Sequence, residues 1–299
     1  MKKAIVIGAN SYIARNLIAA AHDRDDIEIT ALYDRQNQHA DDVPGYRQID
    51  ILDANTYETI DLNTGLIFFF AGKTGTAVGF DEYETFIDVN EKGFLNLLSA
   101  YRNQNSNAKI IYPSTRLVYK GREGKLKEDS EKEFKTIYAI NKYACEQYLK
   151  IYASLYGVEY GIFRICVPYG TLVSNAASYG TAEFMIERAR NKESITLFGN
   201  GSMRRTLTYI GDICETLIYG GLSEHCKNDV YNIGGEDYSL HDMAVLIAEK
   251  FNVPVEFIEW QEAALKMESG DTVFESGKLD GLLDYKHRMR FKEWILRED

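Results

Sequence analysis

The sequence contains few cysteines and no block of basic residues. Its four cysteines (Cys145, Cys166, Cys214 and Cys226) form neither a C-x-x-C pair nor a Cys/His spacing typical of metal ligands. Such sparse cysteine usage fits a reducing cytoplasm, and we expect no metal site. Lys and Arg together number 34 against 45 Asp and Glu, which gives a net charge of −11. An acidic chain without a basic cluster is not attracted to phosphate backbones, so we expect no nucleic-acid binding.

Long apolar runs are also missing. The apolar residues 4–7 end at Gly8, and this run is too short for the core of a signal peptide. The longest later run, 66–71, cannot span a bilayer. Low-complexity linkers and internal repeats are absent too. We therefore expect a cytoplasmic protein without membrane contact, and 299 residues with 45% hydrophobic content are enough for a large core and two lobes.

The chain begins with an apolar strand over 3–7, a turn over 8–11 and a helix over 12–21. This arrangement forms an anion site, because free backbone N–H groups and the helix dipole favour a pyrophosphate. The glycine fingerprint G-x-x-G-x-x-G is filled here as Gly8, Ser11 and Ala14. Ala14 allows close packing of helix on strand, whereas Ser11 narrows the room for a pyrophosphate. The turn alone leaves a dinucleotide site and a plain strand–helix connection equally open.

Carboxylates follow the next two strands. The strand over 27–33 ends in Asp34, where a dinucleotide fold places the acid that binds the adenosine ribose. Asp34 favours NAD, because the 2′-phosphate of NADP would meet a like charge, but Arg35 could receive that phosphate and leaves NADP open. After a strand over 46–49, Asp50 is expected to meet the adenine amino group. Asp53 has two equal interpretations, an adenine contact and a helix N-cap.

Two further strands lead towards the expected ligand edge of the sheet. An unbroken apolar run over 66–71 predicts a buried central strand. A long amphipathic helix is predicted over 81–103, and the strand over 109–112 then delivers Ser114 and Thr115 at its carboxyl end. Ligands of open α/β sheets bind at that end of the strands. Thr115 is therefore a candidate site residue.

Tyr138 and Lys142 lie four residues apart in a helical pattern and share one face. The ordinary pKa of tyrosine is about 10, and a neighbouring positive charge favours the phenolate, so Tyr138 is a candidate proton acceptor. In a chain with 21 Tyr, chance alone gives roughly one such pair, and a solvated helix edge is the common alternative. The preceding nucleotide-type strands and Thr115 favour the catalytic interpretation.

The remaining chain contains no second nucleotide fingerprint. Strands are predicted over 158–166, 195–198, 205–209, 229–233 and 255–260, and a helix over 240–251. We therefore predict an α/β fold with a Rossmann-type doubly wound parallel sheet in residues 1–170, which would bind NAD(P). A smaller α/β substrate lobe is predicted over 171–299, with segments near 205–235 packing back on the first domain.

Together these motifs resemble the extended short-chain dehydrogenase/reductase family, in particular its NAD-dependent epimerase/dehydratase group, which modifies nucleotide sugars. The resemblance covers nearly the whole chain. Each piece is weak, but their order and spacing are specific. The matching pieces are the Gly8 turn, Asp34, 50–53, 90–96, 114–119, 138–142, Arg164 with 168–170, 199–201 with Arg204 and Arg205, 209–212 and 231–235.

The resemblance implies a role for each matching position. Thr115 would hydrogen-bond the sugar oxygen that becomes a ketone, Tyr138 would act as acid and base, and Lys142 would hold the nicotinamide ribose and lower the Tyr138 pKa. Arg205 would bind the substrate diphosphate, and Asn90 matches a structural asparagine. The NAD contacts would be Gly8, Asn10, Ser11, Tyr12, Ile13, Asp34, Arg35, Asp50, Ile51, Ala71, Gly72, Asn90, Tyr138 and Lys142.

The sequence also departs from the family pattern. The two acids that eliminate water in the family's dehydratases are replaced by Arg116 and Leu117, so dehydration is disfavoured. A later phosphate-binding arginine of the family aligns with Glu268. Substrate anchoring must therefore differ, and the candidates to replace that arginine are Arg116, Arg204, Arg288 and Arg290.

The resemblance implies an NAD-dependent nucleotide-sugar epimerase that oxidises and re-reduces C4 through a keto intermediate. A 4-keto nucleotide-sugar reductase that uses NAD(P)H is the alternative. A non-catalytic protein that senses dinucleotides is a third hypothesis, and the retained Tyr138 and Lys142 argue against it. Helices around 86–101 and 137–152 are expected to form a homodimer, although their apolar residues would also suit packing on the sheet. The nucleotide and the sugar stay open.

Overall fold

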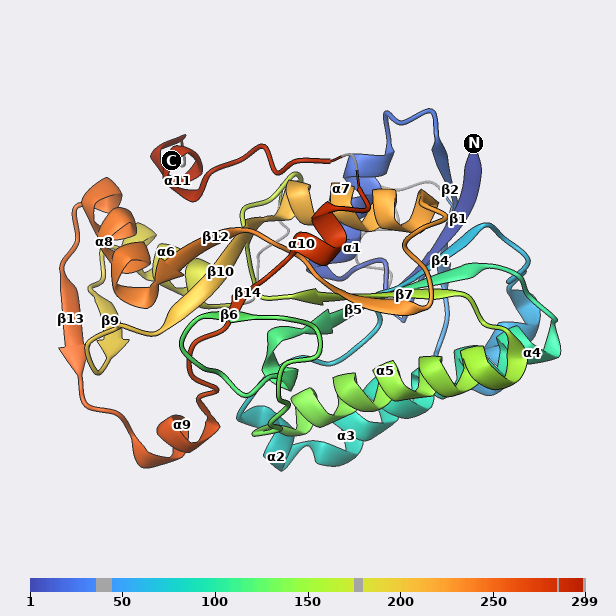
Figure 1. The fold of residues 1–299 in the computed structure, drawn as a ribbon, viewed down its shortest axis with the longest axis horizontal. Coiled ribbons are helices and arrows are strands. Elements are labelled where there is room, and N and C mark those ends of the chain that lie inside the picture. Colours follow the sequence, from blue (N-terminus) through green and yellow to red (C-terminus); the bar gives the residue numbers. More distant parts are fainter. Residues whose placement is uncertain (36–44, 175–179, 284, 298–299) are drawn as a thin grey trace.

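The computed structural model describes residues 1–35, 45–174, 180–283 and 285–297 (Figure 1). Its centre is a seven-stranded sheet of order β11-β7-β5-β4-β1-β2-β3 in which all neighbouring strands are parallel. The strands are β1 (Lys2–Ile7), β2 (Ile27–Asp34), β3 (Tyr46–Gln48), β4 (Leu66–Phe69), β5 (Lys109–Thr115), β7 (Tyr160–Ile165) and β11 (Asp229–Asn232). The prediction of a Rossmann-type α/β fold is confirmed.

Helices cover both faces of this sheet, which explains why its strands are apolar without interruption. Successive side chains of a strand point to opposite faces. Ala4 and Val6 of β1 therefore join a core with α1 (Tyr12–Ala21) and α7 (Ile210–Leu222). Ile5 and Ile7 join a second core with α4 (Gly93–Asn103) and α5 (Ile137–Tyr156). Figure 1 shows α1 and α7 on one side of the sheet and α4 and α5 on the other.

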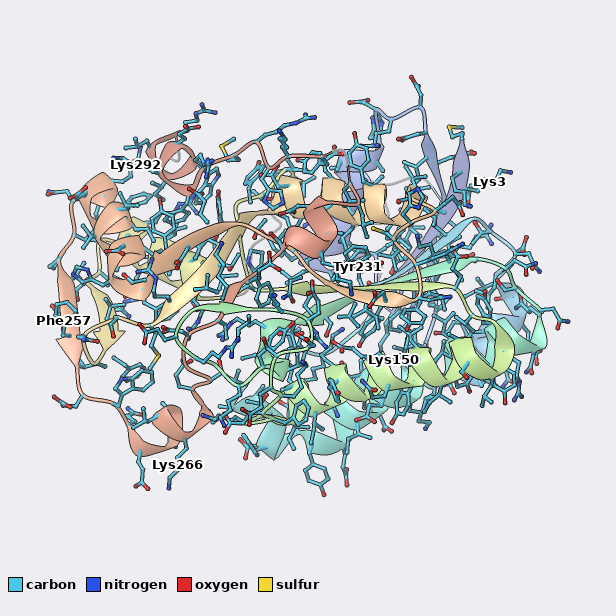
Figure 2. The ribbon with its side chains drawn as sticks, viewed as in Figure 1. Lys3, Lys150, Tyr231, Phe257, Lys266 and Lys292 are labelled. Atoms are coloured by element: carbon cyan, nitrogen blue, oxygen red, sulfur yellow. The ribbon has the colours of Figure 1, made fainter. Side chains whose placement is uncertain are left out.

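A second group of elements surrounds a core of its own. It contains the sheet β12-β10-β8 and the pair β13-β9, and the pair β14-β6 lies between the two groups. Figure 2 places Phe257 at the opposite end of the longest axis from Lys3 of β1. The elements of this group and of the pair beside it are β6 (Lys125–Leu126), β8 (Val167–Tyr169), β9 (Ile195–Phe198), β10 (Arg204–Tyr209), β12 (Glu236–Ser239), β13 (Val255–Ile258), β14 (Val273–Phe274), α6 (Thr181–Arg190), α8 (Leu240–Phe251), α9 (Glu262–Met267) and α11 (Phe291–Arg297). The short helix α10 (Gly277–Asp280) instead packs on the first core through Leu279 and contacts β11.

The chain crosses between the two groups more than once. After β10 it returns as α7, which packs against α1, and as β11, which pairs with β7 at the edge of the central sheet. Within the described residues, every helix is too short or too polar to cross a membrane.

The single helix predicted over 81–103 is wrong in detail. The structure has α2 (Val78–Asp81), α3 (Tyr83–Ile87), a π-helical turn η2 (Asp88–Lys92) and then α4. The break lies at Glu82, whose φ of −115° and ψ of 31° are not helical. The wider turn at η2 contains Asn90, and π turns inside helices are frequent at functional sites. The apolar period over this stretch is continuous, so it could not reveal either interruption.

A buried ion pair joins α5 to β7. Arg164 Nε and Nη2 donate to the two carboxylate oxygens of Glu146 at 2.9 and 2.6 Å, and the side chains are only 2% and 0% exposed. Ser114 Oγ of β5 donates to the same carboxylate at 2.5 Å, and Arg164 Nη1 donates to the Tyr119 hydroxyl at 2.7 Å. Buried charges are tolerated when they are paired and hydrogen-bonded. This pair therefore fixes α5 relative to the end of β5.

We predict that Glu146→Gln destabilises the fold strongly, because it leaves the Arg164 charge buried without a counter-charge. The expected loss is about 3–5 kcal/mol in the free energy of unfolding, measured by urea denaturation. Glu131→Gln is the matched control, since the Glu131 side chain is 70% exposed in its pair with Lys120 and surface pairs contribute little. Equal losses in the two variants would contradict this account.

Candidate active site

Five residues with expected roles lie at one edge of the central sheet. Gly8 follows β1, Asp34 ends β2, Asp50 comes shortly after β3, Ala71 comes shortly after β4, and Thr115 ends β5. The strands are parallel, so their carboxyl ends share this edge. The strand order reverses between β1 and β4, and ligands of open α/β sheets bind outside such a reversal.

Gly8 occupies a position that only glycine fits. Its φ is +87°, and a Cβ atom there would lie 2.2 Å from the backbone nitrogen of Ala71. That nitrogen donates to the Ile7 carbonyl at 3.1 Å, which brings the ends of β1 and β4 together. The first glycine of the fingerprint is therefore required by the backbone itself.

Ser11 takes the second glycine position without strain. Its φ of −67° and ψ of 154° suit any L-residue, and its hydroxyl accepts a hydrogen bond from Ala14 N at 3.4 Å as the N-cap of α1. At the same helix start, the Tyr12 hydroxyl donates to the Gly170 carbonyl at 2.5 Å. Ser11 thus caps the helix at the position where the fingerprint has its second glycine, and the helix terminus that would face a pyrophosphate is kept.

The carboxylate of Asp34 is held by the backbone. Asn10 N donates to Oδ2 at 2.8 Å and Arg35 N donates to Oδ1 at 2.7 Å. These contacts aim the carboxylate at the glycine turn and keep it as an acceptor, which suits the hydroxyls of a ribose. The Arg35 carbonyl accepts from Gln48 Nε2 at 3.0 Å, so the ends of β2 and β3 are also linked.

The two acids after β3 both stabilise local turns. Asp50 Oδ1 accepts from Leu52 N at 3.0 Å, and Asp53 Oδ1 accepts from Asn55 N at 3.0 Å as the N-cap of the 3-10 helix η1 (Ala54–Thr59). Of the two interpretations of Asp53, the structure shows the N-cap. The neighbouring Ile51 packs against Gly93, where a Cβ atom would lie 2.5 Å from Ile51 Cδ1.

Asn90 fixes the segment that follows β4. Its Oδ1 accepts from Lys73 N at 2.7 Å and its Nδ2 donates to the Lys73 carbonyl at 3.0 Å. A Cβ atom at Gly72 would lie 3.1 Å from the same Oδ1. Cys145 of α5 donates from Sγ to the Asn90 carbonyl at 3.1 Å. Asn90 therefore positions the Ala71–Gly72 edge against α5.

The glycine turn, the capped helix start and the oriented Asp34 carboxylate together fit a dinucleotide. Ile13 lies in the first turn of α1, next to Tyr12. Among the residues that the structure describes, no cluster of three His, Cys, Asp or Glu side chains is arranged to hold a metal ion.

The three expected catalytic residues lie on elements that contact each other. Thr115 is 8% exposed, and its Oγ1 accepts from Leu117 N at 3.3 Å, which leaves its O–H free to donate. Thr136 caps α5 by accepting from Ala139 N at 3.1 Å, so Tyr138 stands in the first helical turn. The helix packs against β5 and the 3-10 turn η3 (Arg116–Val118) that follows it.

The expected electrostatic support of Tyr138 by Lys142 is not found. Burial raises the pKa of Tyr138 to about 12 and lowers the pKa of Lys142 to about 8. No hydrogen bond joins the two side chains, and Lys142 Nζ instead lies 3.9 Å from the centre of the Tyr112 ring. Burial disfavours both charged forms, so a phenolate at Tyr138 requires charge from outside this pair.

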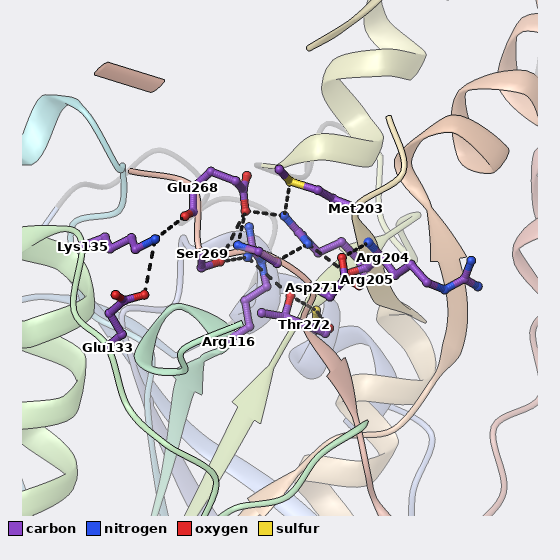
Figure 3. Close-up of polar contacts among 12 residues, drawn as sticks. Arg116, Glu133, Lys135, Met203, Arg204, Arg205, Glu268, Ser269, Asp271 and Thr272 are labelled. Atoms are coloured by element: carbon purple, nitrogen blue, oxygen red, sulfur yellow. Dashed lines mark hydrogen bonds and ion pairs between the residues drawn. The ribbon is translucent and has the colours of Figure 1, made fainter. Parts of the chain in front are cut away.

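Arg205 is not an open anion-binding residue. Its side chain is 2% exposed, and Nη2 donates to Glu268 Oε1 at 2.6 Å (Figure 3). Nη1 donates to the carbonyls of Gly270 and Arg204 at 2.6 and 2.9 Å. Glu268, which stands where the family has its later phosphate-binding arginine, is therefore the partner of Arg205. A direct contact between Arg205 and a diphosphate would require this pair to separate.

The sequence did not identify the residues that hold the site elements in place. Ser114 and Glu146 tie the end of β5 to α5, but neither was a candidate. The spacing offered one signal, because Glu146 follows Lys142 by four residues and so lies on its helix face. The Arg205–Glu268 pair had no such signal, since 63 positions separate the two residues.

A family model agrees with this geometry. The model described as "NAD dependent epimerase/dehydratase family" matches residues 4–234. One curated relative is a putative UDP-glucose 4-epimerase of Methanocaldococcus jannaschii, 28% identical over 163 residues, which are 54% of this chain and 52% of that protein. Another is a CDP-paratose 2-epimerase of Salmonella typhi, 26% identical over 257 residues, with 76% and 75% covered. The matched stretch thus spans about half of the first relative.

Solved structures share the fold along nearly the whole chain. A UDP-glucose 4-epimerase of Thermus thermophilus in complex with NAD superposes with a TM-score of 0.83 at 22% identity, covering 98% of this chain and 96% of that one. Pal from Bacillus thuringiensis gives a TM-score of 0.85 at 19% identity, with 99% and 97% covered.

The burial of Lys142 generates a pH prediction. Because burial lowers its pKa, Lys142 is charged below about pH 8 and loses its charge as the pH rises through that value. We expect the Lys142 Cε resonance of protein with ¹³C-labelled lysine to titrate with a midpoint near 8, and Lys142→Arg to remove that resonance. A midpoint near the ordinary lysine value of about 10.4 would contradict the described environment.

Proposed function

Because this chain belongs to the NAD dependent epimerase/dehydratase family, we propose that it is a nucleotide-sugar epimerase acting at C4. NAD is the cofactor, and when bound it supplies the oxidation and re-reduction of that carbon. The observation that supports the proposal is that α5, which carries Tyr138 and Lys142, packs on β5, which ends at Thr115, and on η3, which follows it.

Residues of the chain would bind the sugar and the ribose and would transfer the proton. Thr115 retains a free O–H, which would donate to the reacting sugar oxygen, and Tyr138 would take and return its proton. Lys142 would bind the nicotinamide ribose. Arg116 and Leu117 offer no carboxylate for removing a hydroxyl group, which disfavours dehydration. The relatives' names include epimerases of UDP- and CDP-sugars.

A one-way 4-keto nucleotide-sugar reductase is the second candidate, and Arg35 beside Asp34 supports it through a role in NADPH binding. Such an enzyme would consume added NADH or NADPH steadily in the presence of a keto-sugar, whereas an epimerase would not.

A cytoplasmic homodimer is also part of the proposal. Large apolar side chains are about half exposed on α2, α3 and α5, which contact one another, and neighbouring exposed apolar residues are typical of interaction surfaces. Their exposed fractions are 51% for Phe80, 46% for Ile87, 49% for Ile140, 51% for Ile151 and 66% for Leu155. We propose that this face contacts a second copy, because α4 uses its own apolar residues within the sheet core.

We predict that Tyr138→Phe lowers turnover of the nucleotide sugar by at least about 100-fold, because the proton acceptor is lost, while NAD stays bound. Turnover is followed by separating the two epimers, and bound NAD by its release on denaturation. Tyr143→Phe on the same helix is the control and should keep its activity, since that ring packs on Phe134. Full activity of Tyr138→Phe would disprove the assigned role.

A further inference from the structure

Within the described residues, Arg116 forms no ion pair of its own. It directly follows Thr115, and its Nη1 donates to the hydroxyls of Ser269 at 2.9 Å and Thr272 at 3.5 Å. Among the described residues these neutral oxygens are its hydrogen-bond partners, and it forms no ion pair. In a chain of net charge −11, a guanidinium held next to the reacting position without an ion pair requires an explanation.

The nearby carboxylate of Glu268 is shared between Arg116 and Arg205. Glu268 is engaged by Arg205, and Arg205 is itself a second cation close to Arg116 (Figure 3). Asp271 Oδ1 accepts from the backbone nitrogen of Arg204. Burial and the charge of Arg205 lower the pKa of Arg116 to about 10 against the opposing effect of Glu268, so the guanidinium is still charged at neutral pH. The surroundings therefore hold an excess positive charge.

Three N–H donors of Arg116 remain for a ligand. A guanidinium has five N–H groups, and the two contacts described use only those on Nη1. Arg205 Nε is a fully buried nitrogen without a partner, whereas Nε and Nη2 of Arg116 are not buried in this way. Nε and Nη2 form the fork that matches the two oxygens of a carboxylate.

The place of Arg116 in the chain indicates which part of the substrate it meets. Its Cα is about 3.8 Å from that of Thr115, which would hold the oxygen on C4. In a hexuronic acid the carboxylate carbon is attached to C5, the ring neighbour of C4, whereas the diphosphate is attached to C1 across the ring. The backbone of Arg116 is therefore on the C4–C5 side of the sugar, and its guanidinium extends from there to Ser269 and Thr272.

We propose that Arg116 binds a carboxylate on the sugar and that the substrate is a nucleotide-linked uronic acid. This inference rests on the proposed function and narrows its substrate class. Arg116 is a specificity-determining residue in this account, because a neutral hexose would leave its charge unpaired and partly desolvated.

The test uses the NAD-loaded protein and pairs of nucleotide sugars that share a nucleotide and differ only at C6. The probes are UDP-glucose with UDP-glucuronate, and the matching glucose and glucuronate pairs of dTDP, GDP and CDP. Isothermal titration calorimetry gives Kd for the wild type, Arg116→Gln, Arg116→Lys and the control Arg188→Gln. Arg188 of α6 pairs at 3.2 Å with Glu193, which follows that helix, and its side chain is likewise partly exposed.

In the nucleotide series that binds best, the uronate should bind about 10- to 100-fold more tightly than the neutral hexose. Arg116→Gln should remove this preference, Arg116→Lys should keep part of it, and Arg188→Gln should keep all of it. An equal loss for both members of a pair would show that Arg116 meets the diphosphate instead and would overturn the inference. So would a preference that survives in Arg116→Gln, or no preference in the wild type.

The proposed function fails in a different way. If no pair binds in any series while NAD remains bound, the assignment to nucleotide sugars is overturned, and the inference about Arg116 with it. If nucleotide sugars bind and epimerise without discrimination at C6, only the inference about Arg116 is lost.

Discussion

The ion pair between Glu146 and Arg164 is the contact on which the site geometry depends. It lies where α5, β5 and β7 meet, and the carboxylate of Glu146 also accepts from Ser114, the residue before Thr115. One turn earlier on α5 stands Lys142, and one turn before that stands Tyr138. A single buried carboxylate thus sets the distance between the strand that carries Thr115 and the helix that carries Tyr138 and Lys142. Its burial makes this link rigid, because neither charge can be hydrated in place.

The charges on the substrate side of the site differ from those that the family resemblance implies. Where the family resemblance leads one to expect two arginines for a diphosphate, this chain has Arg205 paired with Glu268, which is locally neutral. The arginine that lacks an ion pair is instead Arg116, next to Thr115 in the chain. The two changes are consistent with each other, because Glu268 neutralises Arg205 and so limits its repulsion of Arg116. The proposed contact at Arg116 would therefore make binding depend on a charge on the sugar.

Much of the fold could be predicted from the sequence, because apolar runs and caps are local signals. The helix over Tyr12–Ala21 has the predicted ends, and Ser11 caps it as a serine at that position should. The helix over Leu240–Phe251 is likewise as predicted, with Ser239 as its cap. The interruption at Glu82 and the π turn around Asn90 were missed, since both depend on how the helix meets the segment after β4. The partners of Arg205 and Arg164 were missed for the same reason: contacts between distant positions leave no period in the sequence.

The central claim is that the cofactor is recycled within one active site. The most direct measurement is to denature the purified protein, separate the released nucleotide by chromatography, and record its identity, its redox state and its amount per chain. This account predicts tightly held NAD or NADH close to one per chain, because an epimerase has no step that requires cofactor exchange. Protein that is purified without dinucleotide and binds NADPH reversibly would contradict the account and favour the reductase.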